Sequence, residues 1–480
     1  MNKHYELIES EVNMIDICII GGGASGIIAA ISARMENPNA TIHILEKNDK
    51  LGKKLLATGN GRCNFSNTSC ASSNEILKFF NMLGIKPRVE EQGRIYPYSG
   101  QAQDVLNAFE AYLNMHDIKI HTGFVVENLI VKTDSIDTEN SDSQIDDEDG
   151  DVRGSGSDSD DHVDSVTSDD HIEIIGIAKK LSAKNVLIAT GGKAGPQFGC
   201  IGDGYKMARV LGHTVTKTIP ALSPIECEGN FEKLKGIRAK ALAKLVKSNI
   251  PPASENDETL VIERDKVIAS EIGEVQFTDY GLSGICIFNL SRDIKIGNDE
   301  TSNFSDYTIV VDLLPEMSLI EVERELTVRR DNLNISPDNL LLSLVPKGLV
   351  DFVLSQAGVD IAKLSEGDTM LAIVCEGQIQ QIKRILNDEQ IQKIAYTLKN
   401  LTFTVTNVKG WQFAQCTSGG IPASEIDMDT MESKIAKGVY FAGELLDYDG
   451  PCGGFNLNNA WDTGIKAGKA MAGKAMAANV

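Results

Sequence analysis

A glycine-rich turn near the start of the chain constrains its fold more than any other feature. An apolar run from Ile15 to Ile20 is followed by the turn GGGASG at 21–26 and then by small residues in a helical pattern. A strand, a tight glycine turn and a helix in this order form the first unit of a dinucleotide-binding fold. The sequence therefore predicts an α/β fold that begins with such a unit.

The residues of this unit have separate predicted roles. Gly21 would allow the tight turn, Gly23 would leave space for a pyrophosphate, and Gly26 would let the helix pack against the strand. Free N–H groups at the helix N-terminus would then bind the anion. Glu46 ends the next apolar run, twenty residues after Gly26, where its carboxylate can accept hydrogen bonds from an adenosine ribose. These residues favour FAD or NAD as the cofactor, and the alternative is a purely structural turn.

A second apolar strand ends in glycine further along the chain. The run 186–189 leads into Thr190, Gly191 and Gly192, and glycine at the end of a strand allows a close approach of backbone to a ligand. The strand pattern around Val126 is expected to lie near the same nucleotide. These four residues are therefore candidate cofactor contacts.

Length and charge limit the class of protein. A chain of 480 residues is expected to hold about two to four domains. The net charge of −22 argues against nucleic acid or an anionic membrane as a partner, because either would require clustered Lys and Arg. A small-molecule substrate is the expected partner, and the oligomeric state is not indicated.

Much of the negative charge lies in one segment. Residues 134–170 hold fifteen acidic residues and one basic residue, Arg153, so about fourteen of the 22 excess negative charges are there. Because this segment has few apolar side chains, we expect a disordered insertion. Calcium binding is the alternative, although no stretch has the EF-hand pattern.

Cysteine usage and the N-terminus indicate the compartment. The nine cysteines are an odd number and are scattered without a C-x-x-C pair, which favours free thiols in a reducing compartment. No Cys or His spacing indicates a metal site. The first residues, MNKHYELIESEVNMID, carry acids where a signal peptide would be basic. The sequence predicts a soluble, cytoplasmic protein without a membrane span.

Changes in pattern along the chain predict three parts. Strand and helix patterns alternate in 1–220 and 415–480, so the chain is expected to start and finish in one dinucleotide-binding domain. Short β-type segments in 221–315 and 400–414 predict a β-barrel or sheet. Residues 316–399 are mostly helical in pattern and look like a further insertion.

Four motifs together resemble the family of FAD-dependent oxidoreductases that includes bacterial aminoacetone oxidase and the BaiN-like proteins. They are GGGASG with the Glu46-Lys47 pair, GKKLLATGNGRCNFSN (52–67), ATGGKAGPQFGCIGDGY (189–205) and AGELLDYDGPCGGFNLNNAW (442–461). The resemblance implies a Rossmann-type FAD-binding domain, an inserted β-barrel domain and a small helical domain.

The resemblance also implies which residues contact FAD. The segment from Lys53 to Asn64 would run from the pyrophosphate toward the isoalloxazine ring, and Glu444 or Asp447 would lie near the ribityl and pyrophosphate part. The implied contacts are Ala24, Ser25, Lys47, Lys53, Thr58, Gly59, Asn60, Gly61, Arg62, Cys63, Asn64, Gly443, Glu444, Gly454, Phe455, Asn456 and Leu457. Asn458 departs from the family, which usually has Gln there, so no flavin contact is carried over to it.

Several of these residues have alternative interpretations. Arg62 is an anion partner or part of a surface ion pair, and Cys63 is a packed thiol rather than a redox group, because no resolving cysteine is near. Asp203 is expected to form a turn without a chemical role. Tyr205 and His213 are expected to be core or surface residues, and no residue is singled out as a general base.

The expected activity is hydride transfer between a small organic substrate and FAD, with reoxidation by O2 or another acceptor. Family resemblance suggests an amine or amino-ketone substrate. One alternative is an NAD(P)H-dependent reductase of an unsaturated or steroid-like compound, although no second G-x-G-x-x-G unit indicates a stable nicotinamide site. Another alternative is a flavin-binding protein without catalytic activity.

Overall fold

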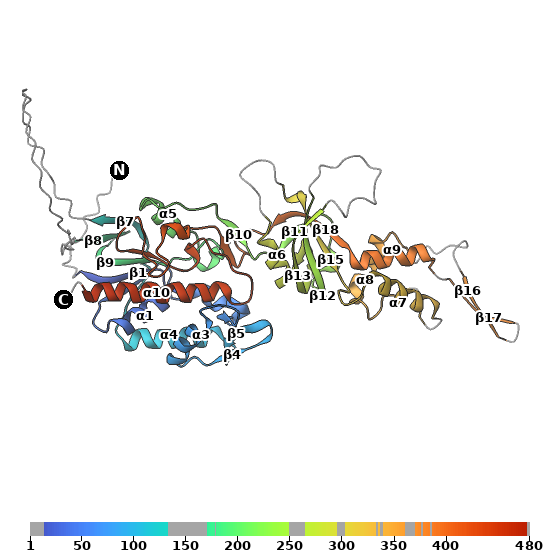
Figure 1. Cartoon of the computed structure of the whole chain (residues 1–480), viewed down its shortest axis with the longest axis horizontal. Coiled ribbons are helices and arrows are strands. Elements are labelled where there is room, and N and C mark those ends of the chain that lie inside the picture. Colours follow the sequence, from blue (N-terminus) through green and yellow to red (C-terminus); the bar gives the residue numbers. More distant parts are fainter. Residues whose placement is uncertain are drawn as a thin grey trace, which may run out of the picture.

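The structure is a computed structural model, and it describes residues 14–132, 170–177, 179–248, 265–294, 303–332, 335–336, 339–360, 370–375, 378–384 and 386–477. Figure 1 shows that the structure has four parts, which lie in a row along the long axis of the molecule. A lobe built on a large sheet is followed by a barrel, by a group of helices and by a hairpin. Residues 222–415 of the described ranges are called the barrel lobe below, and the rest is called the sheet lobe.

A seven-stranded sheet forms the centre of the sheet lobe. Five of its strands run parallel, in the order β6 (Lys119–Thr122), β2 (Ile42–Glu46), β1 (Ile15–Ile20), β9 (Lys180–Ile188) and β20 (Val439–Phe441). Two more, β8 (His171–Gly176) and β7 (Val126–Lys132), extend the sheet antiparallel from β9. Most residues of β1 and β2 and the C-terminal half of β9 are buried, because both faces of the sheet are covered there.

Helices α1 (Ala24–Glu36) and α10 (Phe455–Ala477) pack against each other beside this sheet (Figure 1). Small residues make the close packing possible, since a Cβ on Gly464 would lie 2.5 Å from Ser25 O and one on Gly468 would lie 2.3 Å from Ala29 O. The first and last regular elements of the described chain therefore share one lobe. The other helices of the lobe are α2 (Lys53–Ala57), α3 (Ser73–Met82), α4 (Ala102–Met115) and α5 (Asp203–Val210).

Two small sheets complete the sheet lobe. One has the order β3 (Ser66–Asn67), β5 (Arg94–Pro97) and β4 (Pro87–Val89), all antiparallel. In the other, β10 (Ile219–Ala221) pairs with β19 (Cys416–Ser418), so the two crossings of the chain between the lobes run side by side.

The barrel is closed and antiparallel. Its strands follow the order β11 (Ile225–Cys227), β14 (Gly281–Ser283), β13 (Asp265–Thr278), β12 (Arg238–Ser248), β15 (Tyr307–Asp312) and β18 (Leu401–Val408). Helix α6 (Ile285–Ser291) packs against β13. The fold class predicted from the sequence, a Rossmann-type sheet with a β-barrel, is confirmed.

Between β15 and β18 the chain forms α7 (Leu319–Asp331), α8 (Lys347–Gln356) and α9 (Asp388–Lys399). Buried side chains of these helices and of the barrel belong to one hydrophobic core. This region also contains an antiparallel hairpin, β16 (Met370–Cys375) with β17 (Gln378–Arg384), which the helical interpretation of 316–399 did not include. The exact domain limits remain predictions.

The structure tests the expected lack of a membrane span and the predicted disordered segment only within the residues that it describes. Within the described ranges, no helix combines the length and apolar character needed to cross a bilayer. The predicted disordered segment at 134–170 lies outside the described residues, except for Asp170. Its neighbours Lys132 and His171 are paired across β7 and β8.

Candidate functional site

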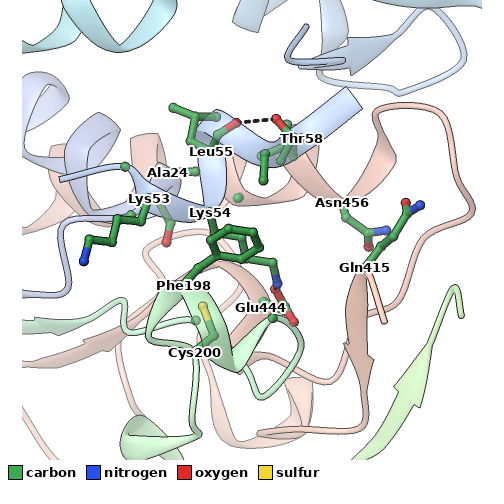
Figure 2. A pocket seen from close by; sticks show the side chains of 18 of the residues that line it. Ala24, Lys53, Lys54, Leu55, Thr58, Phe198, Cys200, Gln415, Glu444 and Asn456 are labelled. Carbon is green, nitrogen blue, oxygen red and sulfur yellow. Dashed lines mark hydrogen bonds and ion pairs between the residues drawn. The ribbon is translucent and has the colours of Figure 1, made fainter. Parts of the chain in front are cut away.

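A pocket of about 710 Å³ lies where the two lobes meet. This is within the range of roughly 300–1,000 Å³ found for ligand and cofactor sites. Its walls come from the turn after β1, the end of β2, the segment that follows α2, the glycines after β9 and the turn before α10. Figure 2 shows side chains of these segments converging from different parts of the chain.

The glycine turn after β1 has the geometry that the sequence predicted. Gly21 has φ +110°, and a Cβ there would lie 2.4 Å from Ala189 O. A Cβ on Gly26 would lie 2.0 Å from Gly21 O, so the start of α1 is in direct contact with the turn. A Cβ on Gly23 would meet no protein atom within 4 Å. Gly23 therefore opens onto the pocket, whereas Gly21 and Gly26 are required by close packing.

The N-terminus of α1 offers unpaired donors to this space. Its first internal hydrogen bond runs from Ile27 N to Gly23 O at 3.0 Å. The N–H groups of residues 24–26 precede that bond and have no acceptor within the helix. Together with the partial positive charge of the helix end, they suit a phosphate.

Glu46 is buried at the end of β2 and already has three protein donors. Its Oε2 accepts from Gly22 N at 2.8 Å, and its Oε1 accepts from Asn48 N at 2.8 Å and Asn48 Nδ2 at 2.7 Å. A carboxylate has about four lone-pair sites, so one remains for a ligand hydroxyl. The predicted ribose contact is compatible with this arrangement.

Two lysines of the pocket form ion pairs across it. Lys47 pairs with Asp203, the first residue of α5, so the predicted turn residue also neutralises a pocket cation. Lys54 Nζ lies 2.6 Å from Glu444 Oε2, and Figure 2 shows the two side chains meeting in the pocket. Glu444 Oε1 accepts from Thr417 N and Thr417 Oγ1, both at 2.9 Å. Glu444 thus ties α2 to the crossing strand β19 beneath the pocket.

The segment 58–64 follows α2 and curls against the pocket through left-handed backbone. Gly59 and Asn60 have φ of +57° and +56°. Asn64 Oδ1 is buried and has no hydrogen-bond partner, which is an unfavourable state for an isolated protein. Since Asn64 lines the pocket, a ligand donor would satisfy this oxygen.

Arg62 lines the pocket, whereas Cys63 lies buried behind its wall. The Arg62 guanidinium pairs with Glu90 and lies 4.1 Å from the centroid of the Tyr96 ring, at the pocket wall. Cys63 is fully buried behind the wall, and burial raises the pKa of its thiol to about 12 despite a hydrogen bond with Thr58. The interpretation of Cys63 as a packed thiol agrees with this position, because a reactive cysteine needs an accessible thiolate.

The turn before α10 closes the other end of the pocket. A Cβ on Gly454 would lie 2.2 Å from Ser66 O. The Asn456 side chain accepts from Gly450 N and donates to Gly450 O, both at 2.8 Å. Asn458 Oδ1 accepts from Ser66 Oγ at 2.7 Å and its Nδ2 donates to Ser72 Oγ at 2.8 Å. Asn458 is absent from the pocket wall, so the shorter side chain at this position serves packing.

The structure places most predicted contacts on the pocket wall. Those that line it are Gly21, Gly23, Ala24, Ser25, Glu46, Lys47, Lys53, Thr58, Gly59, Asn60, Arg62, Asn64, Val126, Thr190, Gly191, Glu444, Gly454, Asn456 and Leu457. Those that lie behind it are Gly26, Gly61, Cys63, Gly192, Gly443 and Phe455. Gly192 and Gly443 have a packing reason, since a Cβ would lie 2.3 Å from Thr417 Oγ1 and 2.6 Å from Ser25 Oγ respectively.

No sequence motif indicated the wall that the barrel lobe provides. This wall consists of Leu222, Ile285, Phe288, Gln412, Phe413, Ala414 and Gln415. Phe198, Cys200 and Tyr448 of the sheet lobe were also missed. The motif containing Phe198 and Cys200 was recognised, but nothing in it distinguished these two residues from their neighbours.

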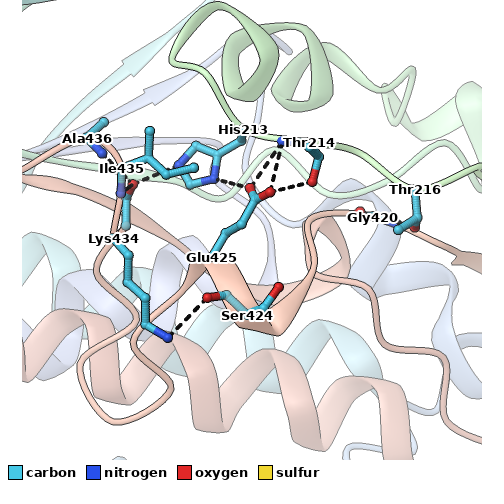
Figure 3. Close-up of polar contacts among 10 residues, drawn as sticks. His213, Thr214, Thr216, Gly420, Ser424, Glu425, Lys434, Ile435 and Ala436 are labelled. Atoms are coloured by element: carbon cyan, nitrogen blue, oxygen red, sulfur yellow. Dashed lines mark hydrogen bonds and ion pairs between the residues drawn. The ribbon is translucent and has the colours of Figure 1, made fainter.

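His213 and Tyr205 are structural, as expected. His213 is buried, and its ring forms two hydrogen bonds, one between Nδ1 and Glu425 Oε2 at 2.8 Å and one between Nε2 and Ser433 Oγ at 2.7 Å (Figure 3). Thr214 also donates to Glu425. The Tyr205 hydroxyl donates to Glu444 O at 3.0 Å. His213 is not among the residues that line the pocket.

Comparison with known proteins identifies the family. The sequence pattern of the HI0933-like protein Rossmann domain matches residues 15–74 and 151–470. The chain belongs to the HI0933-like family. The resemblance inferred from the four motifs is therefore confirmed, and the chain is an oxidoreductase of an FAD-dependent class.

Proteins with known names align with nearly the whole chain. A 3-dehydro-bile acid delta(4,6)-reductase of Clostridium scindens is 31% identical, and the alignment covers 95% of this chain and 98% of that protein. A ribosomal RNA dihydrouridine synthase of Escherichia coli is 24% identical over 93% of this chain and 96% of its own length. A solved flavocytochrome c3 fumarate reductase has a TM-score of 0.45 at 13% identity, covering 98% of this chain and 80% of that one.

The pocket fits the cofactor of this family. Open space above Gly23, the unpaired N–H groups of α1 and the free site on Glu46 suit an adenosine diphosphate. Asn64, whose buried Oδ1 has no hydrogen-bond partner among the described residues, also lines the pocket, and an N–H donor of a flavin ring would satisfy this oxygen. The donor set of the pocket thus fits a dinucleotide.

Proposed function

We propose that the chain is an FAD-dependent reductase of a carbon–carbon double bond conjugated to a ketone, in a planar and mostly apolar substrate of steroid size. This proposal follows the reductase alternative of the sequence analysis. The amine or amino-ketone substrate, suggested there by resemblance alone, remains a prediction that no contact in the pocket favours.

The composition of the wall from the barrel lobe is the observation that carries this proposal. Leu222, Ile285, Phe288 and Phe413 give it an apolar surface, and the amides of Gln412 and Gln415 add polar groups. Ile285 and Phe413 are 42% and 51% exposed. Large apolar side chains exposed around a pocket favour an apolar ligand.

The named relatives support the same reaction type. A delta(4,6)-reductase of a 3-dehydro-bile acid and a synthase of dihydrouridine both saturate a double bond conjugated to a carbonyl. Their substrates differ greatly in size and charge. We take the reaction type from both, and the steroid-like substrate from the bile acid reductase because it shares more sequence with this chain.

Residues of this chain would hold FAD along the pocket. Gly21 to Gly26 and the N-terminus of α1 would bind the diphosphate, Glu46 the ribose, and Asn64 with the N–H groups before α10 the ring. Bound FAD would supply hydride transfer to or from the substrate. The barrel wall would exclude water from the reacting carbon, and the amides of Gln412 and Gln415, which line the pocket, would orient a carbonyl.

The test uses purified protein with FAD, NADH or NADPH as reductant, and 3-oxochola-4,6-dienoate. We expect nicotinamide oxidation that depends on the steroid and a product with added hydrogens detected by mass spectrometry. The Ile285→Asp variant should raise KM at least about tenfold, since it places a charge against an apolar substrate. Its control is Ile320→Asp on α7, where the side chain is 69% exposed and does not line the pocket.

Two results would contradict the proposal. One is oxygen consumption with aminoacetone and no reaction with the steroid, which would restore the amine oxidase prediction. The other is flavin binding with no turnover of either substrate class, which would favour the binding protein. Absence of nucleic acid and membrane partners stays a prediction.

A further inference from the structure

A strip of arginine and tyrosine side chains runs out of the pocket along β5. Arg94 and Tyr96 are two residues apart on this strand, so their side chains lie on the same face. Arg88 of β4 is paired directly with Tyr96 and shares that face. Tyr98 continues the ladder, because its N–H donates to Lys86 O at 2.7 Å. Figure 1 shows β4 and β5 on the side of the sheet lobe toward the barrel.

Each tyrosine of the strip carries a guanidinium group on its ring. Arg62 Cζ lies 4.1 Å from the centroid of the Tyr96 ring, and Arg88 Cζ lies 4.1 Å from the centroid of the Tyr98 ring. Stacking of this kind fixes the orientation of an arginine and leaves its N–H edges available. The two pairs therefore form an ordered donor surface.

The strip has an excess of positive charge, unlike the protein as a whole. Arg62 is neutralised by Glu90. Neither Arg88 nor Arg94 forms an ion pair with any residue that the structure describes, and Arg94 donates to the neutral side chain of Gln92. Two guanidinium groups thus remain without a counter-charge in a chain of net charge −22.

The strip is continuous with the cofactor pocket. Arg62, Arg94 and Tyr96 line the pocket, and Tyr96 is only 8% exposed. Tyr98 is 60% exposed, so the strip passes from the pocket wall to the surface.

We propose that the strip formed by Arg62, Arg88, Arg94, Tyr96 and Tyr98 binds an anionic group on the far end of the substrate while the apolar part occupies the pocket. This inference rests on the proposed function for the apolar part. The anionic group is a carboxylate or a phosphate, since either matches the planar donor edge of arginine. The strip would then select acids over neutral molecules of the same shape.

The size of the strip favours a single anionic group over an RNA strand. Within the described residues, two of the three arginines of the strip, Arg88 and Arg94, form no ion pair, and Glu90 neutralises the third, Arg62. An RNA strand would need several cationic contacts with its phosphates. The chain as a whole has a net charge of −22, so it would repel a long polyanion.

The test compares 3-oxochola-4,6-dienoate with its methyl ester on the FAD-loaded protein. We expect the KM of the ester to exceed that of the acid at least about tenfold, because a charge-assisted hydrogen bond to arginine is lost. Arg88→Gln and Arg94→Gln should each reduce this ratio severalfold, and added NaCl should reduce it as well. The matched control is Arg209→Gln on the exposed side of α5, which should leave the ratio unchanged.

Equilibrium dialysis of both compounds separates failure of this inference from failure of the proposed function. If neither compound is reduced but the acid binds more tightly and Arg88→Gln removes the preference, the strip is supported and the proposed reaction is wrong. Equal affinity for acid and ester would overturn the strip. Displacement of the acid by micromolar single-stranded RNA would also overturn it in favour of RNA binding.

Discussion

Glu46 combines a structural role with the predicted ribose contact. It is 7% exposed, and its two oxygens accept from the backbone N–H groups of Gly22 and Asn48. Replacement by alanine would leave both N–H groups without a partner, at about 1–3 kcal/mol each. We expect Glu46→Ala to lower the free energy of unfolding by about 2 kcal/mol or more and to weaken FAD binding. Urea denaturation and FAD titration measure the two effects.

The control for this variant is Glu36→Ala at the exposed end of α1. Surface substitutions of this kind usually change stability by less than about 0.5 kcal/mol. Equal urea midpoints for the two variants would contradict the role assigned to Glu46.

Glu425 is expected to make the free energy of unfolding depend on pH in the acidic range. Burial raises its pKa, but hydrogen bonds from Thr214 and His213 outweigh this, so the pKa of Glu425 lies below its ordinary value of 4.5. A carboxylate with a lowered pKa stabilises the fold above its unfolded pKa, and this contribution is lost as the pH falls through the folded pKa. Glu425→Gln should therefore destabilise the protein at about pH 7 and progressively less below about pH 4.5. A deficit in urea midpoint that stays constant with pH would refute this.

Two glycines of the turn after β1 are needed for different reasons. Gly26 allows close packing of α1, and Gly23 leaves space at the pocket. Gly26→Ala would place a Cβ 2.0 Å from Gly21 O and force α1 away from the turn. Gly23→Ala would meet no protein atom within 4 Å, and φ of −86° at this position is allowed for alanine. We expect Gly26→Ala to destabilise the fold by about 2 kcal/mol or more. Gly23→Ala should keep the melting temperature and lose FAD affinity at least about tenfold.

Thermal denaturation without FAD and FAD titration measure this pair of glycine variants. Loss of stability in Gly23→Ala, or unchanged FAD affinity in it, would mean that the space above Gly23 is not the diphosphate site.

A helix or strand could be predicted from the sequence where its residue pattern is long and contiguous. The strand, turn and helix at 15–36 could be predicted because their signals are contiguous, and the barrel strands because their segments are β-rich. The hairpin β16–β17 was missed since short apolar runs between helices do not distinguish strand from helix. The pocket wall from the barrel lobe was missed because Phe288 and Gln415 reach the site only through the tertiary fold.

The whole molecule should tolerate loss of its acidic segment. Lys132 and His171 are directly paired in the ladder of β7 and β8, so a short turn can join them. We expect a variant with residues 134–169 replaced by Asn-Gly to keep the fold, FAD binding and turnover. This removes fourteen acidic residues and one basic residue, so the net charge falls from −22 to about −9. A melting temperature lowered by more than about 5 °C would show that the segment contributes to the fold.

The two lobes are joined by polar contacts beside the pocket. Arg292 of the barrel lobe pairs with Asp449 of the turn before α10 at 3.3 Å, and Cys452 N donates to Asn289 Oδ1 at 2.8 Å. We expect the space between these lobes to bind FAD. Both the proposed reaction and the role of the arginine strip depend on it.

The absorption spectrum of the purified protein, recorded before and after incubation with excess FAD and removal of free flavin, tests this claim most directly. We predict a flavin spectrum with one FAD per chain and a markedly lower FAD content in Gly23→Ala at equal melting temperature. A folded protein that remains colourless after incubation with FAD would contradict the account.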